Sequence, residues 1–376
     1  MEPASTVYIL SISKHFYPLK YDLIMNVLWL NHRDPLNPKA GGAERTILEI
    51  GKRLVSHGET VTIYSAVWKE SKKFDIIEGI RIVRLGGNIT IHLLLPIYLI
   101  KHKYDVIIND LGHGVPWLFS VLLGKKNLVF FRHLHARSLP GQVNYFIGTI
   151  ITAIEKLYPF IYRNTKIITE SSTSKEDLIN LGIDPLNIIK IPPGVDLEIF
   201  HPGQKKKNVQ LLYFGGFRKY KRPQLLLKVY EQLKDMIKDL KIIVAGDGQL
   251  LKDIEKEAIS KKYDIEFVGR VDQEKLSKII RESWVNLHFS VTEGWGYSIL
   301  EASASGTPTV AFRVPGVIDT IVNNYNGFLV NDIYEFKERI NDIILNENIY
   351  SSNSREFGER FSWDKTTEKW TTLLLS

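Results

Sequence analysis

Two glutamates, Glu293 and Glu301, lie eight residues apart within residues 290–302. An apolar run that predicts a strand precedes them, a helical pattern follows, and Gly294 and Gly296 occupy the turn. Glycines at a strand-to-helix turn let backbone N–H groups approach a ligand, and a helix N-terminus favours phosphate. With one carboxylate at the turn and the other about two turns into the helix, the pair could bind hydroxyls at both ends of a sugar diphosphate. The alternative is an ordinary turn with two solvated glutamates.

A basic loop, residues 214–222, follows another predicted strand and contains Arg218 and Lys221. Cations at this position could stabilise the negative charge that develops when a diphosphate leaves. A solvated surface turn is the alternative. The chain contains no cysteine and no Asp-x-Asp pair. We therefore expect no disulfide, no cysteine-based zinc site, and a diphosphate held by cationic side chains and a helix N-terminus, with no bound metal.

The first half of the chain has weaker signals. Gly41 and Gly42 precede a predicted helix and permit close approach of the backbone to phosphate or an acceptor, or they form a plain turn. His113, His133 and His135 follow predicted strands, where parallel sheets place ligands. For His113 and His135, a structural role and a role on the acceptor side both remain open.

These residues depend on an alternation of strands and helices that restarts after residue 200, which predicts two Rossmann-like α/β domains. The Pro/Gly turn at residues 191–196 separates them. Predicted strands begin with the run that starts at Met25, whereas residues 1–24 are an edge strand or do not belong to the native chain. The apolar runs 91–100 and 115–123 are too short to span a membrane and are expected to be buried elements. Residues 143–162 have helical apolar spacing, typical of a helix packed on its sheet or of a membrane-facing helix.

The motifs together resemble the retaining glycosyltransferases called family 4, whose signature E-x7-E matches Glu293 to Glu301. The resemblance extends over about residues 25–376. Further matching segments are residues 191–200, 245–248, 267–271, 306–310, 314–316, 326–330 and 361–363. It implies the GT-B fold: two Rossmann-like domains facing a central cleft, with a C-terminal helix that crosses back to the first domain. The expected domains are 1–195 plus 358–376, which binds the acceptor, and 196–357, which binds the donor.

The resemblance also implies roles for individual residues. Glu293, His133, Lys221 and Arg218 are the expected catalytic residues; Arg218 is included because Gly216 occupies the place of the usual family arginine. Donor contacts are expected from Gly42, Gly216, Arg270, Val271, Gly294, Trp295, Gly296, Tyr297, Ser298 and Glu301. Gly41, His113 and His135 are expected on the acceptor side, and no metal ligand or cofactor is expected beyond the nucleotide-sugar co-substrate.

The predicted function is transfer of a hexose from a UDP- or GDP-sugar, with retention and without metal, in glycan or glycolipid biosynthesis. An epimerase-like or phosphorylase enzyme of the same fold and a non-catalytic sugar-nucleotide-binding protein are the alternatives. A dinucleotide-dependent enzyme is disfavoured because no complete G-x-G-x-x-G follows the first strand.

Charge bears on the acceptor. Residues 1–195 contain 23 Lys and Arg against 16 Asp and Glu, whereas residues 196–376 contain 26 of each. A basic first domain predicts an anionic acceptor, such as a lipid-linked glycan or phospholipid, at the inner surface of the membrane. Lys101, Lys103, Lys125 and Lys126 are the expected membrane contacts of a cytoplasmic, peripheral protein. A soluble sugar acceptor with an incidental basic surface is the alternative, and nucleic acid is not expected.

Overall fold

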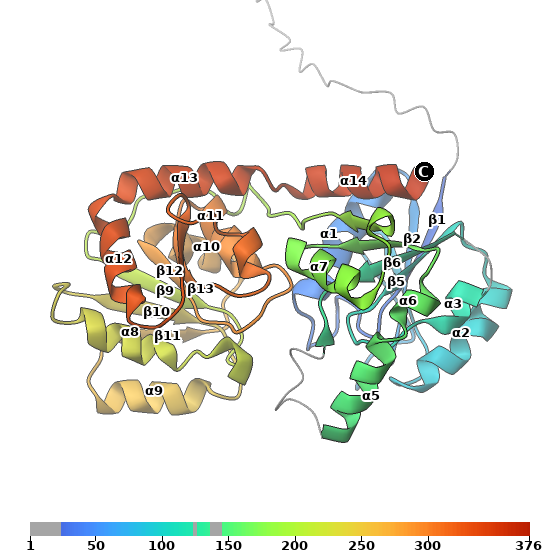
Figure 1. The fold of residues 1–376 in the computed structure, drawn as a ribbon, viewed down its shortest axis with the longest axis horizontal. Coiled ribbons are helices and arrows are strands. Elements are labelled where there is room, and N and C mark those ends of the chain that lie inside the picture. Colours follow the sequence, from blue (N-terminus) through green and yellow to red (C-terminus); the bar gives the residue numbers. More distant parts are fainter. Residues whose placement is uncertain (1–23, 123–125, 136–144) are drawn as a thin grey trace, which may run out of the picture.

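The computed structural model describes residues 24–122, 126–135 and 145–376, which form two α/β domains side by side (Figure 1). The first domain is built on an eight-stranded sheet in the order β3-β4-β2-β1-β5-β6-β7-β8. Its strands are β1 (Asn26–Leu30), β2 (Thr60–Ser65), β3 (Phe74–Ile77), β4 (Ile80–Arg84), β5 (Val106–Asp110), β6 (Lys126–Phe131), β7 (Lys166–Thr169) and β8 (Ile188–Lys190). All pairs are parallel except β3 with β4. Central strands such as β1 and β5 are apolar along most of their length because helices cover both faces.

The described helices of this domain are α1 (Gly42–Ser56), α2 (Thr90–Lys101), α3 (Leu118–Leu122), α5 (Tyr145–Glu155), α6 (Tyr158–Ile161) and α7 (Ser172–Leu181). Local signals set their ends. The Ser171 hydroxyl accepts the Ser174 N–H at the start of α7, and Gly182 ends that helix in a left-handed conformation. These connections leave the carboxyl ends of β1, β5, β6 and β7 at one edge of the sheet, facing the second domain.

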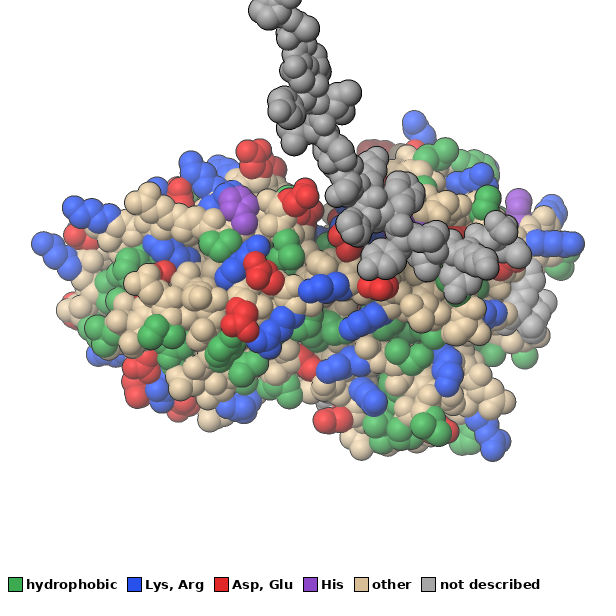
Figure 2. Space-filling model, turned by 90° about the horizontal axis from the view of Figure 1, so that it is seen from above, with side chains coloured by type: hydrophobic (Ala, Val, Ile, Leu, Met, Phe, Trp, Pro, Cys, Tyr) green, Lys and Arg blue, Asp and Glu red, His purple; other side chains and the backbone are tan. Residues whose placement is uncertain are grey.

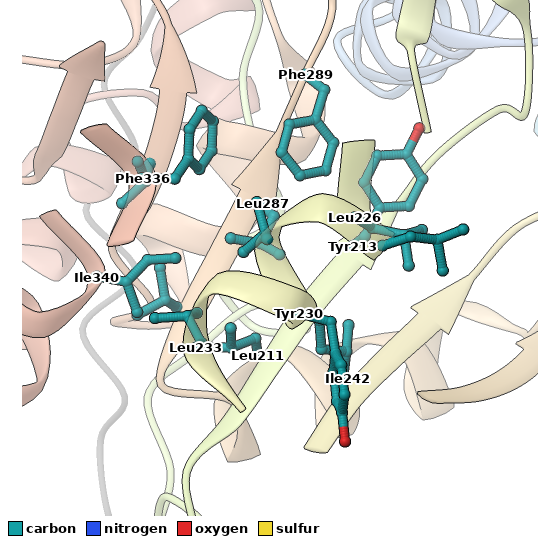
Figure 3. Packing of buried hydrophobic residues seen from close by; sticks show 14 of the residues in the cluster. Leu211, Tyr213, Leu226, Tyr230, Leu233, Ile242, Leu287, Phe289, Phe336 and Ile340 are labelled. Atoms are coloured by element: carbon teal, nitrogen blue, oxygen red, sulfur yellow. The ribbon is translucent and has the colours of Figure 1, made fainter. Parts of the chain in front are cut away.

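The second domain has a six-stranded, all-parallel sheet in the order β11-β10-β9-β12-β13-β14. Its strands are β9 (Gln210–Phe214), β10 (Lys241–Ala245), β11 (Ile265–Gly269), β12 (Val285–His288), β13 (Thr309–Phe312) and β14 (Gly327–Val330). Its helices are α8 (Leu225–Leu233), α9 (Leu251–Ser260), α10 (Gln273–Glu282), α11 (Tyr297–Ala304), α12 (Glu335–Leu345) and α13 (Glu347–Glu359). Leu226 and Leu233 of α8 pack on Leu211 and Leu287 of the sheet (Figure 3).

The C-terminal helix α14 (Trp363–Leu375) returns to the first domain, as the fold class predicted (Figure 1). Its Trp370 ring packs against Trp29 of β1, with 5.2 Å between ring centroids, and against Phe130 of β6. The linker passes beneath the start of α14 at Gly194, where a Cβ atom would lie 2.3 Å from the Trp363 nitrogen. The predicted two-domain GT-B architecture is therefore confirmed.

Three features of the fold were not predicted. The short strands β3, β8 and β14 were missed, and β3 runs antiparallel to its neighbour. The expectation that the apolar runs 91–100 and 115–123 are buried is only half right. Ile97 and Ile100 of α2 are exposed, as is Leu122 of α3. The question of residues 1–24 lies outside the described residues except for Ile24. None of the described helices is long and apolar enough to cross a membrane.

Candidate active site

A cavity of about 490 Å³ lies between the carboxyl edges of the two sheets and is lined by both domains. From the first domain it receives Arg33, Lys39, Gly41, Gly42, Ala43, Glu44, Arg45, Gly112, Arg132, His133 and Glu170. From the second it receives Tyr213, Phe214, Gly215, Arg218, Tyr220, Lys221, His288, Phe289, Ser290, Glu293, Gly294, Trp295, Gly296, Tyr297, Ser298 and Glu301. Most of the predicted catalytic and donor-binding residues therefore share one cleft.

The Glu293 carboxylate contacts three polar side chains of the second domain. Its Oε1 atom forms an ion pair with the Lys221 Nζ atom, accepts the Ser290 hydroxyl at 2.6 Å, and lies 3.1 Å from His288 Nε2. The residue is nearly buried, so every one of these contacts acts in a medium that screens charge poorly. Its neighbours come from the ends of three segments: the basic loop, β12 and the turn before α11.

Burial alone would raise the pKa of Glu293, but the Lys221 ammonium and the His288 ring hold that pKa well below its ordinary value. Burial lowers the pKa of His288, so its imidazole is neutral and donates its Nε2–H to the carboxylate. Burial would also lower the pKa of Lys221, and the Glu293 carboxylate reverses this and raises it. The cleft thus holds a fixed negative and a fixed positive charge in contact near neutral pH.

Backbone geometry puts Glu293 in this position. Its N–H donates to the Pro315 carbonyl at 3.0 Å. Gly316 has φ 78°, and a Cβ there would lie 2.2 Å from the Glu293 carbonyl oxygen. Only glycine allows the two loops to approach this closely. Gly296, with φ 96°, then turns the chain into α11, whose first residues, Tyr297 and Ser298, line the cleft.

Glu301 lies within α11 and forms an ion pair with Arg45 of α1, which links the two domains. Tyr297, the first residue of α11, donates its hydroxyl to Glu170 at 2.9 Å and shares a hydrogen bond with the Thr46 hydroxyl. These contacts join the second domain to the first across the middle of the cleft.

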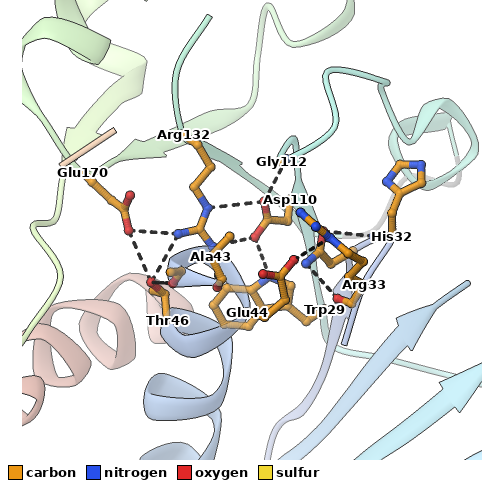
Figure 4. Close-up of polar contacts among 12 residues, drawn as sticks. Trp29, His32, Arg33, Ala43, Glu44, Thr46, Asp110, Gly112, Arg132 and Glu170 are labelled. Carbon is orange, nitrogen blue, oxygen red and sulfur yellow. Dashed lines mark hydrogen bonds and ion pairs between the residues drawn. The ribbon is translucent and has the colours of Figure 1, made fainter. Parts of the chain in front are cut away.

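A buried network lies behind His133 (Figure 4). Arg132 forms ion pairs with Asp110 at 2.8 Å and with Glu170 at 2.9 Å, and it also donates to the Ala43 carbonyl at 3.1 Å. Burial alone would lower the pKa of this guanidinium, and its two carboxylate partners raise it instead. The network fixes the chain immediately before His133, which lines the cleft beside Gly294.

Burial lowers the pKa of His133 to about 3, so its imidazole is neutral at physiological pH. A neutral ring can donate one hydrogen bond and accept another. The His133 ring lies 5.1 Å from that of His135, centroid to centroid.

Not all predicted residues line the main cavity. Gly216, Arg270 and Val271 line an adjoining pocket of about 240 Å³. His135 and His113 lie behind the cleft. His135 Nε2 is 3.2 Å from the Gly112 carbonyl oxygen, and the His113 ring packs at a tilt against His32, with 4.5 Å between ring centroids. Lys126 is predicted as a membrane contact, but its amine donates to the Leu374 carbonyl at 2.8 Å.

The residues without an assigned role in the sequence analysis include Arg45, Glu170 and His288, which line the cleft, and Asp110, which pairs with Arg132 behind it. Asp110 stands at the end of a strand within a segment that the sequence did single out, so its position was a usable signal. Arg45 and Glu170 meet partners 256 and 127 residues away, which no local motif indicates. His288 ends a strand five residues before Glu293, so its position was a usable signal. Among the described residues, no group of three His, Asp or Glu side chains is arranged to hold a metal ion.

Two family profiles match adjacent parts of the chain. The profile described as Glycosyltransferase Family 4 matches residues 40–199, and the one described as Glycosyl transferases group 1 matches residues 195–360. The chain belongs to glycosyltransferase family 4.

Individual relatives agree with this assignment. An uncharacterized glycosyltransferase of Haemophilus influenzae is 26% identical over 89% of this chain and 96% of its own length. Another from Methanocaldococcus jannaschii is 31% identical over 57% of this chain, a match that spans 61% of that relative.

Solved structures share the fold. Sucrose-phosphate synthase from Thermosynechococcus elongatus superposes with a TM-score of 0.76 at 20% identity, over 93% of this chain and 98% of its own. The Anabaena protein Alr3699/HepE, solved in complex with UDP-glucose, does so with a TM-score of 0.71 at 16% identity, over 93% and 99% of the two chains.

Proposed function

We propose that the protein transfers a hexose from a nucleotide-sugar to an acceptor, with retention at the anomeric carbon and without a metal ion. The observation that carries this proposal is the Glu293 site, where a carboxylate, an ammonium and two neutral imidazoles surround a cleft next to a helix N-terminus. The UDP-glucose complex of the Anabaena structure supports a nucleotide-sugar donor.

The donor would lie along the second-domain wall of the cleft. The sugar fits beside Glu293 and His133, which offer a hydrogen-bond acceptor and a neutral donor for its hydroxyls. The Glu301 carboxylate would accept hydrogen bonds from the ribose hydroxyls. This requires Arg45 to share that carboxylate or to release it. The base would occupy the adjoining pocket, at the backbone of Arg270 and Val271.

The departing diphosphate gains negative charge as the glycosidic bond breaks. Lys221 and Arg218 line the cavity together with the first residues of α11. Such preorganised positive charge stabilises the leaving group in the transition state without needing to reorganise. In this proposal the side chains and the helix do what a divalent metal does in enzymes that carry an Asp-x-Asp pair.

For the acceptor we propose a phosphate-bearing glycan or lipid at the inner face of the membrane, reached by a cytoplasmic, peripheral enzyme. The positive balance of residues 1–195 supports this. On the face drawn in Figure 2, Lys and Arg side chains outnumber acidic ones over the first domain, the right half of the view. A relative of this chain, 22% identical over 89% of it, is a phosphatidylinositol N-acetylglucosaminyltransferase subunit of Saccharomyces cerevisiae.

The test is hydrolysis and thermal stabilisation with a panel of UDP-, GDP- and ADP-sugars, with and without excess EDTA. We expect one sugar-nucleotide to be hydrolysed slowly in the absence of acceptor, at the same rate with EDTA. Conversion of the sugar to its epimer would favour an epimerase-like enzyme, and stabilisation without any turnover would favour a binding protein. Loss of activity in EDTA that Mn²⁺ restores would contradict the metal-independent mechanism.

A further inference from the structure

Helix α2 has two apolar faces. One face packs into the first domain through Ile91, Leu95 and Leu99, which are 0–6% exposed. The opposite face carries a stripe of large apolar side chains that no described element covers. This stripe consists of Ile89, Leu93, Ile97 and Ile100, which are 80%, 63%, 54% and 79% exposed. A surface helix of a globular domain normally shows polar residues on this face, so the stripe needs an explanation.

The exposed stripe continues onto the neighbouring edge strand β3. Phe74 and Ile76 point outward there and are 66% and 73% exposed. Between β3 and α2 lies a groove of about 320 Å³ with mostly apolar walls. The groove is lined by Phe74, Val83, Leu85, Leu94, Ile97, Tyr98, Lys101 and His102. The stripe, the two β3 side chains and this groove together form the β3–α2 surface.

Lysines border the β3–α2 surface. Lys72 and Lys73 precede the exposed side chains of β3, and Lys101 and Lys103 follow the stripe at the end of α2; all four are exposed. None of the four takes part in an ion pair within the part of the chain that the structure describes. Lysine is depleted at protein–protein interfaces, whereas apolar side chains bordered by lysines are typical of surfaces that contact anionic lipid.

Helix α2 is connected to the wall of the cleft through two histidines. His92, in the first half of α2, lies 3.0 Å from His32, nitrogen to nitrogen. His32 is followed by Arg33, which lines the main cavity. His92, His32 and Arg33 therefore link α2 to the wall of the cleft, although α2 and α3 lie at the end of the first domain farthest from the second (Figure 1).

We propose that the β3–α2 surface docks into the outer part of an anionic lipid bilayer, so that the first domain stays at the membrane surface. The apolar stripe enters the acyl region and the four lysines contact the headgroup phosphates. This inference rests on the proposed function, since it supplies the physical contact that a lipid-linked acceptor requires.

Vesicle flotation of the full chain tests it. We expect binding to vesicles of phosphatidylglycerol and phosphatidylcholine at low salt, and weaker binding to phosphatidylcholine alone. Ile97→Glu should reduce partitioning roughly tenfold or more, because an apolar side chain that the proposal places in the acyl region is replaced by a charge. Lys101→Gln with Lys103→Gln should reduce the salt dependence. The matched control is Ile259→Glu on α9, where the isoleucine is 70% exposed on the second domain; it should leave binding unchanged.

Equal flotation of Ile97→Glu and wild type, or no flotation of wild type, would overturn the proposal. A wild-type dimer in solution that Ile97→Glu converts to monomer, without vesicle binding, would overturn it in favour of a second copy of the chain. Nucleotide-sugar hydrolysis, measured in the same samples without vesicles, tests the proposed function separately. Intact hydrolysis with no flotation leaves the enzyme assignment standing and removes only the docking surface.

Discussion

The ion pair on the second-domain wall of the cleft and the buried histidines of the first domain respond to burial in opposite ways. On the second-domain wall, Glu293 and Lys221 are kept ionised and in contact. In the first domain, burial lowers the pKa of His32 to about 2 and those of His113 and His133 to about 3, so these rings remain neutral. Of the three, His133 lines the cleft. Near pH 7 an imidazole is neutral in any case, so burial of the neutral ring has no charge cost. At lower pH, burial makes protonation of these rings unfavourable in the folded protein.

The difference follows from what each wall must do in the proposed reaction. A leaving diphosphate builds charge, and a wall with preorganised ions can stabilise that charge without rearranging. An acceptor hydroxyl needs orientation, which neutral donors and acceptors supply without attracting counter-ions. Four predictions test whether this division holds.

The largest effect is expected from Glu293→Gln. The amide keeps the shape and one acceptor oxygen that the Ser290 hydroxyl can still reach, but it removes the charge that pairs with Lys221. We expect transfer activity to fall by about 10²–10³-fold, as for loss of a preorganised electrostatic group. Steady-state kinetics with the preferred donor measures this.

Glu274→Gln, a first-turn glutamate of the exposed face of α10, is the matched control and should retain full activity. If the Glu293 variant stays folded and keeps more than about a tenth of wild-type kcat, the charged wall is not the catalytic one.

A smaller effect is expected from Glu301→Ala. The variant loses the ribose contacts and leaves Arg45 without its carboxylate partner. Donor affinity should fall by roughly 1–3 kcal/mol, the cost of lost charge-assisted hydrogen bonds. Calorimetric titration of the folded variant with the nucleotide-sugar measures it. Unchanged affinity would mean that Glu301 serves the Arg45 bridge alone.

The second-domain wall of the cleft was largely predictable from sequence, because its residues are spaced locally along the chain. Glu293, Gly296 and Glu301 lie on one strand–turn–helix unit, so their spacing in the sequence already determines their relative positions. Lys221 could be placed because it, too, follows a strand of the same sheet.

The first-domain wall was much less predictable because it is formed by contacts between residues far apart in the sequence. Nothing in the sequence indicates that Arg132 meets Glu170, 38 residues away, or that His32 meets His92, 60 residues away. The exposed face of α2 was mispredicted for a related reason. Its pattern is apolar on both sides, and hydrophobicity alone does not tell which side the rest of the domain covers.

The third prediction concerns the buried histidines of the first domain and acid. Between pH 6.5 and about 3, the unfolded chain protonates His113 while the folded protein does not. The unfolded state then binds more protons, so stability is fully present above pH 6.5 and decreases as pH falls. His113→Phe removes this titration while keeping a ring against His32. We expect the slope of unfolding free energy with pH to decrease by up to about 1.4 kcal/mol per pH unit.

Urea unfolding at several pH values from 7 to 5 measures the slope. His57→Gln, at the exposed C-terminal end of α1, provides the control and should leave the slope as in wild type. A slope that is equally steep in both variants would show that His113 accepts a proton in the folded state and is not kept neutral.

The smallest effect is expected where the two walls meet, at the Tyr297 hydroxyl. Burial raises the pKa of Tyr297, so the hydroxyl stays protonated and donates to Glu170. In Tyr297→Phe the ring still fills the space beside Gly42, and Glu170 keeps its ion pair with Arg132. No buried charge is left unpaired, so the loss should be that of an ordinary hydrogen bond, about 1 kcal/mol of unfolding free energy.

The kcat should change less than the KM for donor, because the contact aligns the start of α11 with the first domain and touches no reacting atom. Tyr334→Phe, at a tyrosine 78% exposed on the second domain, is the matched control. If Tyr297→Phe and this control have the same stability and the same KM, the Tyr297 hydroxyl does not couple the two walls, and the Arg45–Glu301 ion pair must carry that coupling.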